Sequence, residues 1–448
     1  MNPFVAFHMK TTSKNVEMQA RARQRIPGMT QLLSKRPDMF SLGVWPTYYR
    51  KAEGVHVWDL DGRRYLDMSI AGIGANVLGY ADPDVDDAVM KAIRDGVSCS
   101  LNCPEEVELA ELLCELHPWA EMVRFTRSGG EAMAVAVRIA RALTGRDKIA
   151  FCGYHGWHDW YLSANLNAAD ALGEHLLSGL APAGVPAVLK NTAFPFRYNR
   201  RDDLQAIVNA HGRDLAAIVM EPLRSEKPAA GFVAGVRDLA RACGAVFVVD
   251  EISAGLRYNT GGAHLVFHDT APDMAVFSKA LGNGYPMAAV IGTTDVMQAA
   301  QKTFISSTCW TERIGPAAAL ATLHKHRSID AGQKLVALGK QMTAGWQDLA
   351  DRYELAIHIG GMAPMAHFAF THEKARSLKA YFIQLMLEQG FLASTVFYAM
   401  AAHTPDHIRQ YLDAADAAFA AVKDSLVQDD IDRRLKGEPA AVGFKRIA

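Results

Sequence analysis

The fold is decided by Met274-Ala-Val-Phe-Ser-Lys-Ala-Leu-Gly-Asn-Gly-Tyr-Pro286, an apolar run that ends in a lysine and continues into a glycine-rich turn. The apolar part has the length of a buried β-strand. An ammonium group at the edge of such a strand loses solvation, which lowers the pKa of the lysine and makes its amine a nucleophile toward carbonyl groups. Lys279 is therefore a candidate catalytic residue, and a solvated strand end is the alternative interpretation.

Asp250 stands at the end of a second apolar run, Ala245-Val-Phe-Val-Val249. An acid and a lysine at two strand ends suit pyridoxal phosphate, because the lysine forms a Schiff base with the aldehyde and the carboxylate keeps the pyridine nitrogen protonated. The simpler alternative is that Asp250 and Glu251 cap the helix that follows them.

Short apolar runs alternate with helical stretches through the middle of the chain. One helical stretch runs from Glu131 to Leu143 and stops at Gly145. Such alternation predicts an α/β fold with a largely parallel sheet covered by helices on both faces. The expected strands are Val123–Thr126, Lys148–Cys152, Ala216–Met220, Ala245–Val249 and Met274–Ser278.

The two ends of the chain read as a mixture of strand and helix. We expect residues 68–314 to form a large domain, and residues 1–67 and 315–448 to supply a smaller α+β domain built from both chain ends. Residues after Val422 form a charged tail.

Composition excludes several classes of protein. The 448 residues include 47 basic and 48 acidic ones, so no net field favours nucleic acid or an anionic membrane surface. The apolar runs are too short to span a membrane, and residues 1–9 lack the pattern of a signal peptide. Six scattered cysteines form no Cys-x-x-Cys pair, which indicates neither zinc nor a disulfide framework and favours the cytoplasm.

Polar residues follow the predicted strands where the strands end. Ser128-Gly-Gly130 opens a helix and offers backbone N–H groups to an anion, although a plain tight turn explains it equally well. The cluster Gly153-Tyr-His-Gly-Trp-His158 offers a ring that could stack on a flat heterocycle, or it is a surface loop. Ligands of α/β sheets bind at this edge, so we expect these segments to meet Glu221, Asp250 and Lys279 there.

Four segments resemble the motifs of class III, fold-type-I pyridoxal-phosphate aminotransferases, and the closest branch is that of glutamate-1-semialdehyde aminomutase. The resemblance extends from Ile26 to Thr404. The motifs are Arg127-Ser-Gly-Gly-Glu-Ala132, Gly153-Tyr-His-Gly-Trp-His-Asp159, Asp250-Glu-Ile-Ser-Ala-Gly-Leu-Arg257 and Phe277-Ser-Lys-Ala-Leu-Gly-Asn-Gly-Tyr-Pro286.

The resemblance implies a role for each matching residue. Lys279 would form the Schiff base and Asp250 would hold the pyridine nitrogen. Thr311, five residues before Pro316, would reach the phosphate of a neighbouring subunit, which implies a homodimer with shared active sites. The other cofactor contacts would be Ser128, Gly129 and Gly130 at the phosphate, Tyr154 and Ile252 on the two ring faces, and His155 beside them.

The chain also departs from the family pattern. Gly130 stands where the family has threonine, which removes a hydroxyl from the phosphate site. The aminomutase's arginine motif after Ile26-Pro-Gly28 is missing, with Lys35 and Arg36 as candidate substitutes. Glu226 matches a glutamate that transaminases pair with a switching arginine, but the sole arginine between Ile357 and His403 is Arg376, in a predicted helix. Further substrate-contact candidates are Arg257 and Trp157.

These features predict a pyridoxal-phosphate-dependent aminotransferase that moves an amino group to or from a small polar or sugar-derived aldehyde or ketone. The first alternative is an intramolecular aminomutase acting on a glutamate-1-semialdehyde-like substrate. A second alternative is a catalytically idle protein of the same fold with an assembly or regulatory role, which the presence of both Lys279 and Asp250 disfavours. A nicotinamide-dependent enzyme is disfavoured because no Gly-x-Gly-x-x-Gly follows an early strand.

Overall fold

The computed structural model describes residues 13–175, 178–223 and 226–441. Its largest sheet has seven strands in the order β4-β10-β9-β8-β7-β5-β6, and β10 is antiparallel to both of its neighbours while the other pairs are parallel. This arrangement confirms the predicted α/β fold. The strands are β4 Met122–Thr126, β5 Lys148–Cys152, β6 Ala193–Pro195, β7 Leu215–Met220, β8 Val246–Asp250, β9 Met274–Phe277 and β10 Ala288–Gly292.

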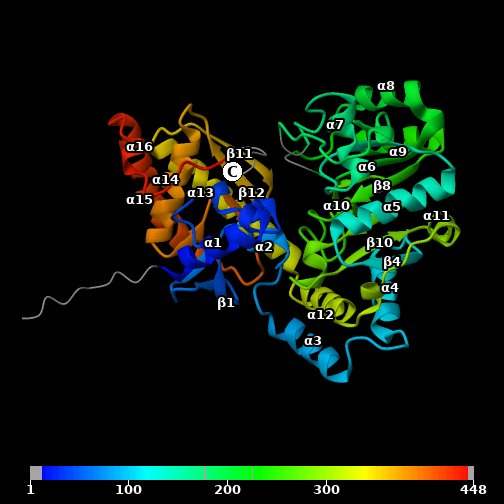
Figure 1. The fold of residues 1–448 in the computed structure, drawn as a ribbon, viewed down its shortest axis with the longest axis horizontal. Helices are drawn as coiled ribbons and strands as arrows, with labels where there is room; N and C mark the ends of the chain where they lie inside the picture. The colour runs from blue at the N-terminus through cyan, green and yellow to red at the C-terminus, as the bar shows by residue number, and fades with distance from the viewer. Residues whose placement is uncertain (1–12, 176–177, 224–225, 442–448) are drawn as a thin grey trace, which may run out of the picture.

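Helices cover both faces of this sheet, which is why its central strands are apolar along their whole length. Ala217 and Val219 of β7 pack in a core with α5 (Gly129–Thr144), whereas Ile218 and Met220 pack in a second core with α9 (Phe232–Cys243). Helix α8 (Arg201–His211) packs beside α9. Figure 1 shows these helices around the strands on the right of the molecule.

Both ends of the chain lie together on the left in Figure 1. A four-stranded sheet has the order β1-β2-β3-β13, and its parallel pairing of β13 (Phe391–Ala393) with β3 (Arg64–Met68) joins the two ends directly. The other strands of this region are β1 Tyr49–Glu53 and β2 His56–Asp59, and a three-stranded sheet contains β11 Ile357–Met362, β12 Met365–Phe370 and β14 Val396–Tyr398. We propose residues 67 and 314 as the domain bounds, because β3 and α12 lie at these points.

Long helices pack on these smaller sheets, with Trp346 fully buried in the shared core. They are α13 Ala331–Arg352, α14 Ala375–Glu388 and α15 Pro405–Val427, and α12 Ile314–Ser328 packs on α3 Pro83–Asp95 and α4 Pro104–Leu116. The shorter helices are α1 Lys14–Arg25, α2 Ala71–Gly74, α6 Asp159–Leu162, α7 Ala164–Asn167, α10 His264–Phe267, α11 Thr294–Met297 and α16 Ile431–Arg434. Single 3-10 turns are η1 Pro27–Met29, η2 Leu33–Lys35, η3 Pro37–Met39, η4 Ala187–Leu189, η5 Gly212–Asp214, η6 Lys279–Gly282, η7 Gln298–Lys302 and η8 Thr308–Thr311.

The segment after Val422 is charged, as expected, but its described part is folded rather than a free tail. Helix α15 continues to Val427, and α16 then packs on α14 with Ile431 buried. Arg434 pairs with Asp424 and Asp430, so the charges of this segment largely neutralise one another.

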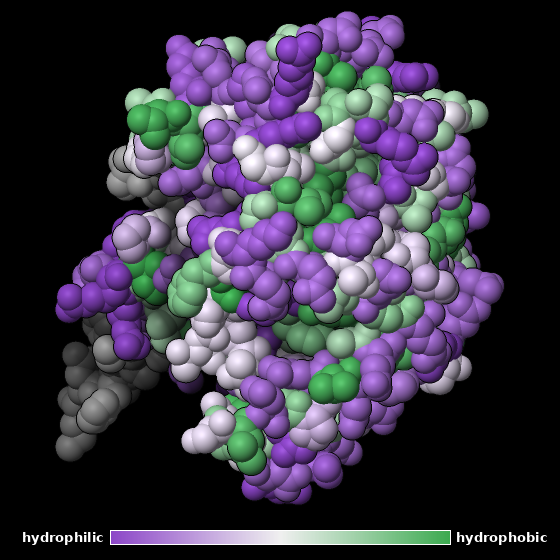
Figure 2. Space-filling view, turned by 90° about the vertical axis from the view of Figure 1, so that its right-hand side faces the viewer, coloured by the Kyte–Doolittle hydropathy of each residue, from purple (hydrophilic) through white to green (hydrophobic). Residues whose placement is uncertain are grey.

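The surface on the side of the seven-stranded sheet is mostly hydrophilic, and small groups of apolar residues interrupt it (Figure 2). Within the described residues, no helix is both long enough and apolar enough to cross a membrane.

Candidate active site

Lys279 lies two residues after the end of β9, at the start of the turn η6, and has a left-handed backbone with φ of 48°. Its Nζ donates a hydrogen bond of 2.7 Å to Oγ of Ser253. Burial lowers the pKa of the Lys279 amine, and the positive charge of Arg257 lowers it further against the opposing charges of Asp250 and Glu221. The amine is therefore easily deprotonated, as a nucleophile toward a carbonyl must be.

Asp250 ends β8, next to the strand that carries Lys279. Its Oδ1 accepts from the backbone N–H of Ile252 at 3.0 Å, and its Oδ2 lies 2.7 Å from Nδ1 of His155. The other ring nitrogen of His155 lies 3.2 Å from the carbonyl oxygen of Cys152. Both ring nitrogens thus face oxygen atoms, which fixes the orientation of the His155 ring beside Asp250.

Helix α5 begins at the turn predicted to bind an anion. Oε2 of Glu131 accepts from the backbone N–H of Ser128 at 2.9 Å and from its hydroxyl at 3.1 Å, which fixes the start of the helix. A Cβ on Gly129 would lie 2.9 Å from Cδ1 of Ile252. Glycine at this position therefore leaves room for the Ile252 side chain. The turn presents free helix N–H groups and the positive end of the helix dipole.

Tyr154 lies two residues after the end of β5, at the same edge of the sheet. Its backbone N–H donates to Oε2 of Glu221 at 3.2 Å, and burial raises the pKa of its phenol. Gly153 must be glycine, because its φ is 125° and a Cβ there would lie 2.4 Å from the Glu221 carboxylate. These contacts bring the ends of β5 and β7 together.

Thr311 lies in the exposed turn η8, outside helix α12, which begins at Ile314. Its hydroxyl donates to the carbonyl of Thr308 at 3.1 Å. The N-cap residue of α12 is Arg313, and the carboxylate of Glu312 accepts from the first N–H groups of the helix, those of Ile314 and Gly315. Thr311 is therefore not the helix cap, and its exposed position leaves it accessible to another subunit.

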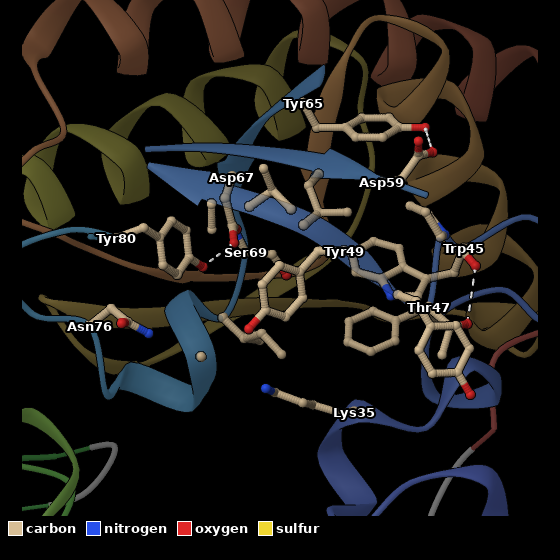
Figure 3. A pocket seen from close by; sticks show the side chains of 18 of the residues that line it. Lys35, Trp45, Thr47, Tyr49, Asp59, Tyr65, Asp67, Ser69, Asn76 and Tyr80 are labelled. Carbon is tan, nitrogen blue, oxygen red and sulfur yellow. Dashed lines mark hydrogen bonds between the residues drawn. The ribbon is translucent and has the colours of Figure 1, made fainter. Parts of the chain in front are cut away.

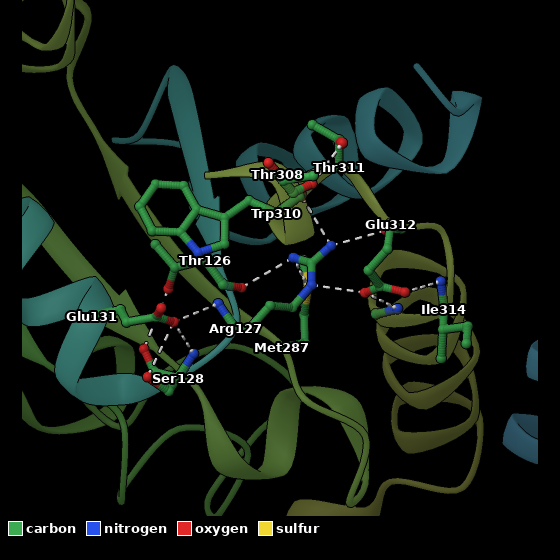
Figure 4. Close-up of polar contacts among 11 residues, drawn as sticks. Thr126, Arg127, Ser128, Glu131, Met287, Thr308, Trp310, Thr311, Glu312 and Ile314 are labelled. Carbon is green, nitrogen blue, oxygen red and sulfur yellow. Dashed lines mark hydrogen bonds and ion pairs between the residues drawn. The ribbon is translucent and has the colours of Figure 1, made fainter. Parts of the chain in front are cut away.

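Arg127 joins this turn to the start of α5, as Figure 4 shows. Its Nη2 donates to the carbonyl oxygens of Trp310 and Glu312, at 2.9 Å each, and its Nε lies 2.7 Å from the carboxylate of Glu312. The turn at the start of α5 and the Thr311 segment are thus held as one unit.

The remaining substrate-contact candidates lie in different environments. Arg257 is buried: its Nη2 donates to the carbonyl of Gly74, its Nη1 has no partner among the described residues, and burial lowers its pKa to about 10. Trp157 is 69% exposed, and Glu226 is exposed on the segment after β7. Arg376 and Arg36 are occupied elsewhere, by the carbonyl of Ala440 and by the carboxylate of Asp38.

Lys35 is the candidate that faces a cavity. A cavity of about 320 Å³ extends from the N-terminal segment to Gly284 of the glycine-rich turn after Lys279. Figure 3 shows Lys35, Tyr49 and Asn76 around the same open space. Deeper in the wall, Tyr80 donates a 2.5 Å hydrogen bond to Asp67, and burial raises the pKa of this carboxyl to about 6.

Several residues of this region were not predicted from the sequence. Ser253 lies within a quoted motif, three residues after Asp250, but a serine gives no signal of its contact with Lys279. Arg127 and His158 also lie within motifs given above. The contacts of Arg127 are with residues distant in sequence, and the feature of His158 is the burial of its Nδ1 atom; neither can be read from the sequence. A glycine whose Cβ would collide with a neighbour has no distinct sequence signature.

These residues fit pyridoxal phosphate. A helix N-terminus with a glycine cradle suits the phosphate, a buried carboxylate suits the ring nitrogen, and a lysine of lowered pKa suits the aldehyde. All three stand at one edge of one sheet.

Comparison with known proteins agrees with this chemistry. The 3-aminobutyryl-CoA aminotransferase of Cloacimonas acidaminovorans is 30% identical over 430 residues, covering 92% of this chain and 98% of the relative. The glutamate-1-semialdehyde 2,1-aminomutase of Bordetella avium is 33% identical over 440 residues, covering 92% of this chain and all of the relative.

Solved structures show the same fold. The FumI protein of Sphingopyxis sp. MTA144, determined in its internal aldimine form with pyridoxal phosphate, superposes with a TM-score of 0.83 at 25% identity, covering 96% of this chain and 99% of that one. An omega-transaminase from Sphaerobacter thermophilus has a TM-score of 0.82 at 24% identity, covering 92% and 99%. The predicted fold type I and the predicted cofactor are thereby confirmed, and the aminotransferase class-III family model matches residues 41–415. The chain therefore belongs to the class-III aminotransferases, the pyridoxal-phosphate-dependent enzymes that move amino groups between an amine and a carbonyl compound.

Proposed function

We propose that Lys279 is the lysine that binds the cofactor aldehyde and that Asp250 is the partner of its pyridine nitrogen. The support is the pairing of a desolvated amine with a carboxylate that His155 holds in place. Ser128, Gly129 and Gly130 would hold the phosphate through the start of α5. Ile252 and Tyr154 would contact the two faces of the ring.

Bound pyridoxal phosphate supplies an electron sink for the substrate carbon that loses its proton. Lys279 Nζ would remove this proton and hold it for return. Ser253 Oγ, 2.7 Å from Nζ, orients the amine, and Arg257 nearby disfavours its protonated form. Asp250 would keep a proton on the ring nitrogen, and His155 holds the Asp250 carboxylate in place at 2.7 Å.

The cavity beside Gly284 supports a small polar or sugar-derived aldehyde or ketone as the carbonyl substrate. Its wall carries one ammonium, one side-chain amide, two carboxyl groups and several hydroxyl groups, which suit a substrate rich in hydroxyls. The residues that carry this proposal are Lys35, Tyr49, Asp67, Ser69 and Asn76.

An intramolecular aminomutase is the second candidate, because one of the relatives bears that activity. The Lys35 ammonium could hold an acidic substrate group, in place of the arginine motif that this chain lacks. The two candidates differ in whether a separate amino acceptor is required.

A donor screen tests the proposal. The cofactor-loaded enzyme is mixed with amino sugars, amino acids, ω-amines and 3-aminobutyryl-CoA. Loss of the yellow absorbance of the bound cofactor reports amino transfer. Turnover that needs an added carbonyl acceptor supports the aminotransferase, and isomerisation without an acceptor supports the aminomutase. Absence of reaction with every polar donor, together with rapid reaction of apolar amines, would overturn the assigned substrate class.

We also propose a homodimer with shared active sites, in which Thr311 contacts the phosphate held by the other subunit. The support is the exposure of Thr311 outside helix α12 and its attachment through Arg127 to the protein's own phosphate turn. The exposed free thiols of Cys99 and Cys309 support the cytoplasm as the proposed location.

A further inference from the structure

Gly130, the second residue of α5, has a neighbour in the place where a side chain would project. A Cβ built on Gly130 would lie 2.7 Å from Cε1 and 2.8 Å from Nδ1 of His158. Contacts this short do not occur between real atoms, so the imidazole of His158 fills the space that any larger residue at position 130 would need.

His158 holds a polar atom in this space without a partner. Its Nδ1 is buried and has no hydrogen-bond partner among the described residues. A buried ring nitrogen that lacks a partner costs free energy, and such atoms in native proteins are usually completed by a ligand or water.

One ring contact and one backbone hydrogen bond hold His158 in position. The indole of Trp157 stacks on the imidazole with ring centres 4.3 Å apart and planes 27° apart. The carbonyl of His158 accepts from the N–H of Tyr161 at 2.9 Å, which ties its backbone to the start of α6. Turning the ring by 180° exchanges Nδ1 with Cδ2 and Nε2 with Cε1, so either orientation presents a nitrogen beside Gly130.

We propose that His158 donates a ring N–H to the phosphate group of the cofactor at the N-terminus of α5, where Gly130 contributes no side chain. The inference rests on the proposed binding of pyridoxal phosphate at Lys279. The imidazole is the donor because the phosphate oxygens only accept, and the helix N-terminus already favours the anion. His158 is a cofactor-positioning residue with no part in the proton transfer.

The phosphate itself separates this role from simple packing. Apoprotein is titrated with pyridoxal 5'-phosphate and, separately, with pyridoxal, which lacks the phosphate; absorbance and protein fluorescence report the dissociation constants. His158→Ala should weaken binding of pyridoxal 5'-phosphate by about 10- to 100-fold, the value of one charge-assisted hydrogen bond. The affinity for pyridoxal should stay within about twofold. Equal weakening for both compounds would reduce His158 to a packing residue, and no weakening for either would overturn the contact.

A compensating pair of substitutions gives an independent readout. Gly130→Thr alone should weaken cofactor binding, because the new side chain collides with His158. Gly130→Thr combined with His158→Ala should recover most of the lost affinity, since the threonine hydroxyl then occupies the vacated space. A double variant no better than His158→Ala would contradict the proposal.

The proposed cofactor lysine is tested apart from this contact. Borohydride treatment of the wild-type holoenzyme should attach the cofactor to Lys279. Labelling of Lys279 together with unaltered cofactor affinity in His158→Ala would remove only the inference about His158. Labelling at another lysine would remove the proposed function itself.

Discussion

Nδ1 of His155 lies 2.7 Å from Oδ2 of Asp250, and neither side chain is more than 3% exposed. The next residue along the chain repeats this arrangement: Glu251 Oε1 lies 2.6 Å from Nδ1 of His264, and both are buried. Two acid–histidine pairs, formed by the adjacent residues Asp250 and Glu251, thus lie at the end of β8. Asp250 points to the predicted cofactor edge, whereas Glu251 also accepts from the N–H groups of Ala263 and His264 and holds a loop.

This duplication gives a mutational test with a built-in control. Asp250→Asn should retain the cofactor and slow proton abstraction by about 10³-fold or more, because the ring nitrogen loses its anionic partner and each tenfold is about 1.4 kcal/mol of barrier. Stopped-flow absorbance of the half-reaction measures the rate. Glu251→Gln should instead lower the free energy of unfolding by about 1–3 kcal/mol, since it weakens buried hydrogen bonds, and should alter the rate far less. Near wild-type rates for Asp250→Asn would exclude it as the pyridine partner.

Reduction with borohydride should attach pyridoxal phosphate irreversibly to Lys279, and the purified holoenzyme should be yellow. Lys279→Ala should still bind the cofactor through the phosphate and ring contacts, yet lose turnover by on the order of 10³-fold or more, because the amine that carries the proton is removed. Peptide mapping by mass spectrometry identifies the labelled lysine. A label on any other lysine contradicts the assignment.

The same lysine should destabilise the cofactor-free protein. Its pKa in the folded state is lowered, chiefly by burial, so the unfolded chain binds its proton more tightly. The resulting loss in the free energy of unfolding is complete at low pH. It decreases as the pH rises through the lowered pKa and disappears above pH 10.5. Lys279→Met should therefore raise the free energy of unfolding of the apoprotein at pH 7, and the gain should shrink toward pH 10.5. Urea denaturation at several pH values measures it; a loss of stability at pH 7 would be inconsistent with a penalty from the buried amine.

Mixed dimers test the shared active site. One subunit carries Lys279→Ala and the other carries Thr311→Glu. If Thr311 serves the neighbouring subunit, both defects fall in one site and the second site is intact, so each mixed dimer should keep about one working site. Differently tagged subunits allow the mixed dimers to be purified and their active sites counted. Two inactive sites would show that Thr311 acts within its own chain.

Acid should unfold this protein through its buried histidines. Burial lowers the pKa of His117, His326 and His403 to about 4 each. Between pH 6.5 and 4 the unfolded chain binds these protons and the folded protein does not, so the free energy of unfolding falls as the pH falls. Asp67, with its pKa raised to about 6, opposes this by binding a proton in the folded state.

The net difference of roughly two protons corresponds to about 2.7 kcal/mol per pH unit near pH 5. Chemical denaturation between pH 4.5 and 6.5 measures this slope. His403→Gln should reduce the slope by about one proton, because the glutamine does not titrate. A stability that does not change over this range would contradict the buried, neutral histidines.

Five strands of the seven-stranded sheet could be predicted almost to the residue, and the reason is physical. Strand β5 occupies the predicted range Lys148–Cys152, because a strand covered on both faces is apolar throughout and bounded by polar residues. Strand β10 was not predicted. It begins at Ala288, two residues after Pro286 ends the glycine-rich turn, so the turn pattern hides the start of the strand. Strand β6 has three residues and is too short to give a pattern.

The site could be predicted as a set of strand ends but not as a set of contacts. Proximity of His155 to Asp250 follows from the parallel order of β5, β7 and β8, whereas its hydrogen bond depends on the conformation of a loop. The contact of Arg127 with Glu312 joins residues far apart in the sequence, and nothing local to either one reveals it.

Strand β4 is made before every other strand of the seven-stranded sheet, yet it lies at the edge and pairs with β10, the last of them to be made. At a synthesis rate of about 5–20 residues per second, roughly 10 to 30 s separate the emergence of the two strands from the ribosome. During that interval the nascent chain can assemble β5 to β9, but it holds the phosphate turn after β4 without a partner strand. A chain that stops before Ala288 holds β4 without its partner strand β10, so we expect the cofactor to bind late in the synthesis of the chain.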